Sequence, residues 1–432
     1  MTLKPIQILY IQHAASIGGS AISLLLTLKA LDRNRFVPVV GLIRPSHVLH
    51  SLYNDIGIKT VDMSDISTYE HTTGISWRYL WPPDWIARLR QRLRIGTTID
   101  ATRRHVQSLR PALVHLNSVV LLPSAIALSG MGIPFVWHVR EHPVDGLLGA
   151  RRRFLRNELL SSKGNIIFLS AADRRAWIGD SPRGDILFNY TDFHADGYAI
   201  LRREQARSDL NLPPNVPIVL FVGGIAAIKG TILFLKAMER VLGRIANMKF
   251  FMPLAPEPEH LPLSLRILRA VLPCFGLGTY SQRVRRLLQS QPLSQACMLL
   301  PVRADIQSLY DACDVVVFPH TVPHFPRPVI EAAAASKPVV ASDLEGMREV
   351  VLDGETGYLT RPGDYQSIAD AVIKLLEAPE QAVAFGKKAY NYLKPQCHLT
   401  DSVKLLESIY ARSLFQARGE AIAASPLVSI HN

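Results

Sequence analysis

The chain has 432 residues, of which 48% are hydrophobic and 19% are charged. This length exceeds what one hydrophobic core usually supports, so we expect two domains of ordinary size, and the composition excludes an intrinsically disordered chain. Lys and Arg outnumber Asp and Glu by 48 to 36, which gives a net charge of +12. Such an excess favours phosphates, anionic lipid surfaces or nucleic acid as partners, without choosing among them.

The cysteines and the hydropathy pattern favour a reducing compartment and no membrane span. The four cysteines are scattered and form no CxxC pair, so neither a disulfide framework nor a zinc site is indicated. The first residues, MTLKPIQILYIQH, read as a strand rather than a signal peptide. The most apolar long window, 113–137, is interrupted by His115, Asn117, Pro123 and Pro134. We therefore expect a cytoplasmic protein.

The first 195 residues alternate strand-like runs with helical patterns, which is typical of βα units and a parallel sheet. An amphipathic helix is predicted at 20–32, and apolar runs predict strands at 7–12, 37–43, 113–116, 135–138, 166–170 and 185–189. A polar stretch at 190–208 then separates this set from the next strand. These elements predict a Rossmann-like domain over residues 1–195.

The pattern restarts after the polar stretch. Strands are predicted at 217–222, 249–253, 296–301, 315–319, 339–342 and 357–360, and helices at 231–245, 329–336, 367–376, 382–393 and 402–417. They predict a second Rossmann-like domain over 196–395, followed at 396–432 by a C-terminal helix and, from about Glu420, a disordered tail. In such an α/β protein, ligands bind in the cleft where the carboxyl ends of the two sheets face each other.

Two glycine turns follow predicted strands and precede predicted helices. The first, HAASIGGS at 13–20, contains Gly18 and Gly19, and the second, VGGIAAIKG at 222–230, contains Gly223, Lys229 and Gly230. Glycine lets a backbone approach a ligand closely, and free N–H groups at a helix start bind anions. Neither turn is a GxGxxG motif, so neither indicates a dinucleotide. Taken alone, the first is consistent with a structural turn, and the second with a solvated lysine beside a glycine that starts a helix. Taken together, the two turns favour a ligand.

Two further segments carry candidate chemistry. Glu331 lies in the first turn of the predicted helix at 329–336, where the helix dipole favours a carboxylate that can accept hydrogen bonds from ligand hydroxyls. The segment WHVREH at 137–142 ends a strand, and His138 there could accept a proton or bind a sugar hydroxyl. The alternative readings are a core histidine and an internal pair between Arg140 and Glu141.

Aromatic and basic side chains alternate in three segments. They comprise Trp77, Tyr79, Trp81, Trp85, Arg88, Arg90, Arg92, Arg94, Arg103 and Arg104; then Arg151, Arg152, Arg153, Phe154 and Arg156; and then Arg266, Arg269, Arg283, Arg285 and Arg286. This mixture suits an anionic membrane surface. A solvated basic helix face explains it equally well. Nucleic acid is not expected, because no recognisable binding module accompanies the charge.

Taken in order, these segments resemble the retaining nucleotide-sugar glycosyltransferases of family four. The resemblance covers nearly the whole chain and is most specific in FPRPVIEAAAASKPVVAS and GETGYLTRPGD, which follow VGGIAAIKG. It implies the GT-B fold, in which two Rossmann-like domains face each other across a cleft. The amino-terminal part of the resemblance is weak by itself.

The resemblance also implies roles for individual residues. Glu331 corresponds to the second glutamate of the family's E-x7-E motif, which contacts the donor's ribose. Lys229 corresponds to the basic residue that neutralises the donor diphosphate, and His138 to a histidine near the transferred sugar. The residues that we assign to binding of the nucleotide sugar are Gly18, Gly19, Gly223, Gly230, Arg327, Val329 and Ile330.

Two positions depart from the family pattern. Pro323 stands where the first glutamate of E-x7-E belongs, and Gly224 stands where the family often has arginine. Each departure removes a charge-assisted hydrogen bond worth roughly 1.5–3 kcal/mol, which Arg303, Arg327 or Arg348 could replace. The alternative to an enzyme is therefore a catalytically inactive homologue that binds a nucleotide or a partner protein. Another GT-B transferase or a sugar-nucleotide epimerase is a further alternative, against which the order of the motifs argues.

The resemblance and the residues together predict a metal-independent, retaining transferase. The donor is expected to be a UDP- or GDP-sugar, with no further cofactor, and the acceptor a lipid-linked or polysaccharide hydroxyl. Lys229 and the N–H groups around Gly18, Gly19 and Gly230 would stabilise the charge of the leaving diphosphate. The setting would be polysaccharide or glycolipid synthesis in the cytoplasm, with peripheral association with the inner face of the membrane.

Overall fold

The computed structural model describes residues 5–69, 82–145, 149–193, 199–254, 280–301, 306–323 and 325–417, with the backbone alone at 82–93, 199–200, 253–254 and 300–301. The described residues form two compact units, which divide after Tyr190 and after His398. The predictions for Trp77, Tyr79, Trp81, Cys274, Arg266, Arg269, Arg303 and the tail from Glu420 lie outside the described residues. The C-terminal helix belongs to the first unit, with the residues up to Tyr190.

The first unit contains a parallel sheet of seven strands in the order β3-β2-β1-β4-β5-β6-β7. Its strands are β1 (Ile6–Gln12), β2 (Phe36–Leu42), β3 (Lys59–Asp62), β4 (Leu113–Leu116), β5 (Phe135–Val139), β6 (Asn165–Phe168) and β7 (Asp185–Ile186). The runs in β1, β4 and β5 are almost wholly buried, because helices cover both faces of a parallel sheet.

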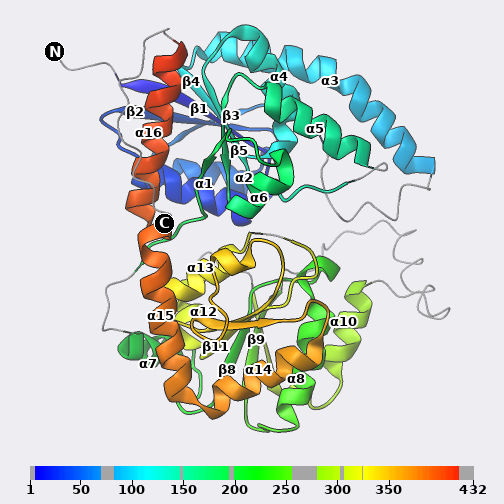
Figure 1. The fold of residues 1–432 in the computed structure, drawn as a ribbon, viewed down its shortest axis with the longest axis vertical. Coiled ribbons are helices and arrows are strands. Elements are labelled where there is room, and N and C mark those ends of the chain that lie inside the picture. The colour runs from blue at the N-terminus through cyan, green and yellow to red at the C-terminus, as the bar shows by residue number, and fades with distance from the viewer. Residues whose placement is uncertain are drawn as a thin grey trace. The chain divides into compact units, whose positions relative to one another are not determined.

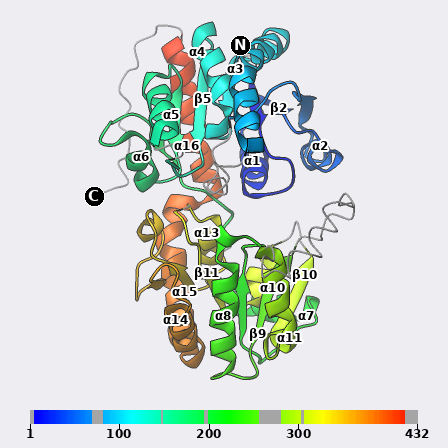
Figure 2. The same cartoon turned by 90° about the vertical axis from the view of Figure 1, so that its right-hand side faces the viewer.

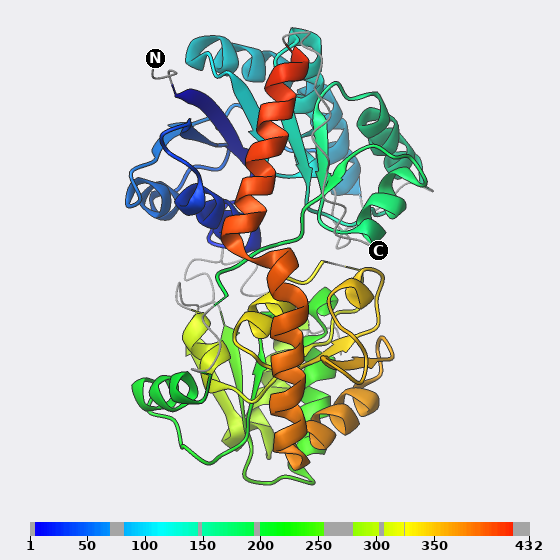
Figure 3. The ribbon, with the colours of Figure 1, turned by 60° about the vertical axis from the view of Figure 1, so that its left-hand side comes forward.

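Two hydrophobic clusters hold helices on the two faces of this sheet. One packs α1 (Gly19–Ala30), α2 (His47–Asn54) and α16 (Leu399–Ala417) on one face. The other packs α3 (Pro82–Leu109), α4 (Leu122–Met131), α5 (Ala150–Ser161) and α6 (Ala171–Ile178) on the opposite face. Figure 1 shows α16 on one side of the sheet and α3, α4 and α5 on the other, and Figure 3 shows α16 running across its face.

The second unit contains a parallel sheet of six strands in the order β10-β9-β8-β11-β12-β13. The strands are β8 (Ile218–Phe221), β9 (Lys249–Leu254), β10 (Cys297–Pro301), β11 (Val315–Phe318), β12 (Val339–Ser342) and β13 (Gly357–Thr360). One core cluster joins this sheet to α8 (Thr231–Leu242), α10 (Tyr280–Gln289), α11 (Leu293–Ala296) and α14 (Tyr365–Glu377). Figure 2 shows α8 and α14 side by side.

The remaining helices of this unit pack in pairs. They are α7 (Ala199–Asp209) against α12 (Gln307–Ala312), and α13 (Arg327–Ala334) against α15 (Pro379–Cys397). Among the described helices of both units, none combines the length and the apolar composition needed to cross a bilayer.

All twelve predicted strands are confirmed, most of them within one or two residues. The strand β3 was not predicted, and neither were the helices α2, α3, α4, α5, α6, α7, α10, α11 and α12. β3 lies at a sheet edge and lacks a buried apolar run. The sequence of α7, AILRREQARSD, is polar, so the stretch at 190–208, which was predicted to separate the two sets of strands, contains a helix that was not predicted. The helix is fixed by ion pairs instead, since Arg203 and Arg207 both reach Asp314, at 2.9 and 2.8 Å.

Candidate active site

The second unit has a topological switch point between β8 and β11. These strands are neighbours in the sheet, although β9 and β10 lie between them in the sequence. Ligands of open α/β sheets bind at the carboxyl ends of the strands at such a point. The loops that leave these two ends are 222–230, after β8, and 319–326, after β11. They contain or border most of the residues predicted for the nucleotide-sugar site.

The two loops lie directly against each other. Gly230 has a φ of +68°, and a Cβ added to it would lie 1.8 Å from the carbonyl oxygen of Pro319. On the other side, the N–H of Thr321 donates to the carbonyl of Ile228 at 3.1 Å. Gly230 is therefore required both by its left-handed backbone and by the close approach of the second loop.

Hydrogen bonds within the first loop fix its shape. The hydroxyl of Thr231, the first residue of α8, donates to the carbonyl of Gly224 at 2.8 Å and accepts from the N–H of Ala226 at 3.2 Å. A Cβ on Gly223 would lie 2.1 Å from the ring of Phe221. The tight packing around the glycines and the hydrogen bonds of Thr231 thus hold this loop in one conformation at the start of a helix.

Lys229 is the cation at this helix start. It is half-buried in the 3₁₀ turn Ala227–Lys229, and its ammonium makes no hydrogen bond or ion pair with the described residues. Burial lowers its pKa to about 8. An ammonium that is partly desolvated and has no protein carboxylate beside it favours an anionic ligand.

Glu331, in contrast, has protein partners on both oxygens. It lies on α13 and is 7% exposed. Its Oε2 accepts from the hydroxyl of Tyr310 at 2.7 Å, and its Oε1 accepts from Nε of Arg327 at 2.6 Å. Burial and the charge of Glu331 raise the pKa of Tyr310 well above its usual range. Because each carboxylate oxygen has a second acceptor site, the pair of partners orients Glu331 and leaves capacity for ligand hydroxyls.

Val329 and Ile330, in the first turn of α13, have buried side chains. The N–H of Val329 donates to the carbonyl of Pro326 at 3.2 Å, which engages that donor within the turn.

In the first unit, the corresponding switch point lies between β1 and β4. Gly18 caps α1, and a Cβ on Gly18 or Gly19 would meet no atom within 4 Å, so this turn is open. Asn117, after β4, ties the loops together: its N–H donates to Ile11 at 3.3 Å and its Nδ2 donates to the carbonyl of Ser20 at 3.2 Å.

His138 lies within β5, one residue before its end, and is 1% exposed. Its ring centroid is 5.5 Å from that of His115, and its Nδ1 is 3.4 Å from Nη2 of Arg140. Burial, then the charge of Arg140, lower the pKa of His138 well below its usual value, so the ring is neutral. These are the surroundings of a core histidine.

The charged residues after β5 are held by neighbouring loops. Arg140 donates through Nε to Asn117 at 2.6 Å and through Nη1 to Asn189 at 3.1 Å. Glu141 accepts from the N–H of Val119 at 2.9 Å and from the hydroxyl of Ser118. Glu141 is thus bound to the loop after β4, and Arg140 to that loop and to Asn189, which follows β7; the N–H of Arg140 also donates to Oε2 of Glu141 at 3.1 Å.

The predicted site residues therefore form two groups. The first unit holds Gly18, Gly19 and His138, and the second holds Gly223, Lys229, Gly230, Arg327, Val329, Ile330 and Glu331. Tyr310, Asn117 and Asn189 were not predicted. No sequence pattern predicts a role for these three residues, because each acts through hydrogen bonds to residues on other helices, strands or loops.

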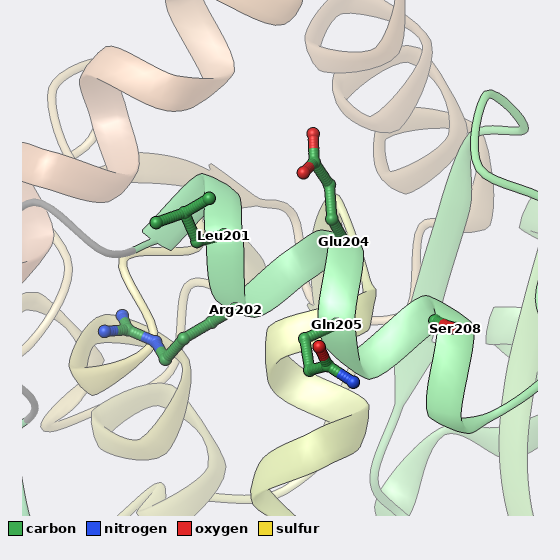
Figure 4. Close-up of a pocket in the computed structure, with 5 residues that line it drawn as sticks. All are labelled: Leu201, Arg202, Glu204, Gln205 and Ser208. Atoms are coloured by element: carbon green, nitrogen blue, oxygen red, sulfur yellow. The ribbon is translucent and has the colours of Figure 1, made fainter.

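A surface hollow lies elsewhere on the second unit, along α7. It is open and is lined by Leu201, Arg202, Glu204, Gln205 and Ser208 (Figure 4). None of these was predicted as a site residue, and the loops after β8 and β11 do not contribute to its lining.

Part of this chain is similar in sequence to known proteins. Residues 202–392 match the family described as Glycosyl transferases group 1. A D-inositol 3-phosphate glycosyltransferase of Corynebacterium aurimucosum is 26% identical over 215 residues, which cover 49% of this chain and 47% of that protein. Another, from Nocardia farcinica, is 29% identical over 222 residues, 50% of this chain and 45% of that protein. The chain thus spans less than half the length of these curated relatives.

Solved structures are similar over nearly the whole chain. The Anabaena protein HepE in complex with UDP has a TM-score of 0.70 and 19% identity, with 94% of this chain and 100% of that chain covered. Sucrose-phosphate synthase from Thermosynechococcus elongatus has a TM-score of 0.70 and 18% identity, with 95% and 100% covered. The predicted GT-B fold of two parallel-sheet α/β domains is confirmed.

Proposed function

We propose that this chain, a family-four-like glycosyltransferase, moves a sugar from a nucleoside-diphosphate donor to an acceptor hydroxyl and retains the configuration at the anomeric carbon. The reaction would use no metal and no cofactor besides the donor. The donor would be a UDP- or GDP-sugar, and the acceptor a lipid-linked or polysaccharide hydroxyl. HepE, which shares the fold, has been solved with UDP and with UDP-glucose.

One observation carries the proposal most directly: Lys229, at the β8–β11 switch point, is a half-buried cation that has no counterion among the described residues. Departure of a nucleoside diphosphate places negative charge on its phosphate oxygens. A fixed cation in a partly desolvated site stabilises that charge strongly, since the protein has already met the cost of orienting it. Lys229 would supply the cation, and the N–H groups near Gly230 would supply further donors.

Glu331 would bind hydroxyl groups of the donor. Arg327 and Tyr310 fix its carboxylate, so the acceptor sites on its oxygens point in set directions. A ribose diol offers two hydroxyl donors to such a carboxylate. Pro323 cannot supply the carboxylate of the first glutamate of the family motif, and Arg327 is the charged side chain nearest to it in sequence.

In the first unit, Arg140 and Asn117 are better placed than His138 to meet an acceptor hydroxyl, because they follow the strands rather than lying within them. In this proposal, transfer on the same face of the sugar means that the departing phosphate receives the acceptor's proton. Synthesis of a polysaccharide or glycolipid, with peripheral binding to the cytoplasmic face of a membrane, is the setting we propose.

The proposal is tested with the purified protein and a panel of UDP- and GDP-sugars. Thermal shift reports donor binding, nucleotide release in the presence of membrane extract reports transfer, and NMR of the product reports anomeric configuration. We expect one nucleotide class to stabilise the protein and its sugar to be transferred with retention. No stabilisation by any nucleotide would overturn the proposal, and stabilisation without turnover would identify an inactive homologue.

A further inference from the structure

Arg151 is a buried cation for which the described part of the first unit provides no counterion. It is the second residue of α5 and is 7% exposed. Its Nε and Nη2 are buried and have no hydrogen-bond partner, and it forms no ion pair with the described residues. A buried guanidinium in this state is costly, because desolvation is not offset by a partner.

The carboxylates near the start of α5 are already engaged. Asp145 pairs with Arg152 at 3.1 Å. Asp173 lies 2.8 Å from Nδ1 of His142 and accepts from the hydroxyl of Ser170 at 2.8 Å. These pairs engage both carboxylates with groups other than Arg151.

The start of α5 adds a second positive feature. The helix has 12 residues, begins after Gly149 (φ +82°) without a side-chain cap, and has no acidic residue in its first turn. Its free N–H groups and dipole are therefore not neutralised by the protein. Side chains in a helix lean toward its N-terminus, so Arg151 at the second position extends toward these same N–H groups.

This helix start also lies at the edge of the sheet where function is expected. α5 follows the loop after β5, so it begins at the carboxyl edge that also carries Gly18, Asn117 and Arg140. In the proposed function, this unit binds the acceptor, whereas the second unit binds the donor.

We infer that Arg151 and the N-terminal end of α5 bind an oxyanion, and that this oxyanion is a phosphate carried by the acceptor. The guanidinium fork matches two phosphate oxygens, and the helix N–H groups match a third. Only the identification of the phosphate as part of an acceptor rests on the proposed function; the anion site itself does not depend on it. The same chemistry would suit a small phosphorylated acceptor or a lipid phosphate.

The test uses Arg151→Met and, as a matched control, Arg153→Met, which removes the same charge from an exposed position in the same turn. Both are made in the Lys229→Ala background, so that phosphate bound at the proposed donor site does not contribute. Thermal shift is measured with inorganic phosphate against chloride at equal ionic strength. We expect phosphate to raise Tm in the background and in the Arg153 variant, and to have no effect in the Arg151 variant.

A second readout separates binding from a merely structural role. Without phosphate, Arg151→Met should have a Tm equal to or above that of the background, since it removes an uncompensated buried charge. A lower Tm together with an unchanged phosphate shift would overturn the inference, and so would equal phosphate shifts in all three proteins. Arg151→Gln is the substitute if the Met variant does not fold, with the same loss of phosphate shift expected.

Two further binding experiments identify the source of the phosphate, and a control with UDP distinguishes failure of this inference from failure of the proposed function. Glycerol 3-phosphate tests a soluble phosphomonoester, and flotation with phosphatidylglycerol against phosphatidylcholine vesicles tests a lipid. Arg151-dependent binding in either arm supports the inference, and its absence from both contradicts it. In protein that retains Lys229, the increase in Tm caused by UDP should be unaffected by Arg151→Met. If UDP caused no increase in Tm at all, the proposed function would be contradicted, but the anion site would not.

Discussion

The two sheet edges that carry the predicted site residues differ in how their charges are satisfied. In the first unit, Arg140 and Glu141 are tied by hydrogen bonds to the loop after β4. In the second, Glu331 is similarly tied, but the side chain of Lys229 has no partner among the residues that the structure describes. A network of satisfied groups fixes shape, whereas a cation without a partner creates affinity for an anion. The first arrangement suits orientation of a neutral hydroxyl and the second suits a diphosphate.

The glycine turns should give the largest difference between the two edges. Gly230→Ala must force a Cβ against Pro319 at a φ of +68°, whereas Gly18→Ala enters open space at an extended φ. We expect Gly230→Ala to lower the free energy of unfolding by about 4 kcal/mol or more, and Gly18→Ala to change it by less than about 0.5 kcal/mol. Urea unfolding measures both, and equal effects would contradict the contrast.

The buried pair in the second unit should come next. Glu331→Ala leaves Arg327 without its carboxylate, and the loss of one partner of a buried pair costs about 3 kcal/mol. Tyr310→Phe removes only a hydroxyl and should cost about 1 kcal/mol. Unfolding of the two single variants and the double variant gives the coupling energy between Tyr310 and Glu331; additivity of the two losses would show that Tyr310 does not act through Glu331.

Lys229→Ala should weaken nucleotide binding and leave folding almost intact. Loss of a charge-assisted hydrogen bond of about 2 kcal/mol raises Kd more than tenfold. With a pKa of about 8, the lysine loses its proton as pH rises through that value, so affinity for UDP or GDP should fall between pH 7 and 9. Lys229→Arg should retain binding and abolish this fall. Titration calorimetry at pH 7 and pH 9 measures the affinity of each variant. If the Arg variant kept the same pH dependence, Lys229 would be excluded as the group that titrates.

The smallest effect concerns the buried histidines of the first unit. Burial lowers the pKa of His115 to about 3 and that of His138 well below its usual value. Below pH 6.5 the unfolded chain therefore binds more protons than the folded protein. As the pH is lowered, the free energy of unfolding decreases by up to about 1.4 kcal/mol per pH unit for each histidine. His138→Gln should flatten the pH dependence of unfolding between pH 6.5 and 5. An unaltered slope would mean that His138 is protonated in the folded protein.

Most of the fold follows from local patterns. Strands such as Val315–Phe318 and Val339–Ser342 are short, continuous apolar runs, because both faces of a parallel sheet are buried, and such runs are easily recognised. The polar helix α7 escaped prediction because its stability comes from ion pairs with Asp311 and Asp314, which lie a hundred residues away.

The candidate site was less accessible to prediction. Sequence motifs located Lys229 and Glu331, but not whether each has a protein partner, since Tyr310 comes from a different helix. Arg151 shows the same limit. A run of arginines reads as a solvated face, yet Arg151 shares a buried stripe with Leu155 and Leu159, at intervals of four residues. Which arginine of the run faces inward depends on the orientation of α5.

The C-terminal helix α16 has a consequence for how the protein forms during synthesis. Tyr410 contributes to the core of the first unit and bonds His115 at 2.7 Å, nearly three hundred residues earlier. The second unit is continuous in sequence, so all of its strands emerge before α16 does. The first unit is therefore completed only after the second, and until α16 has been synthesised, the part of the sheet face that this helix covers stays exposed beside α1 and α2. A chain stopped before Leu399 would leave that part of the apolar face exposed and prone to aggregation.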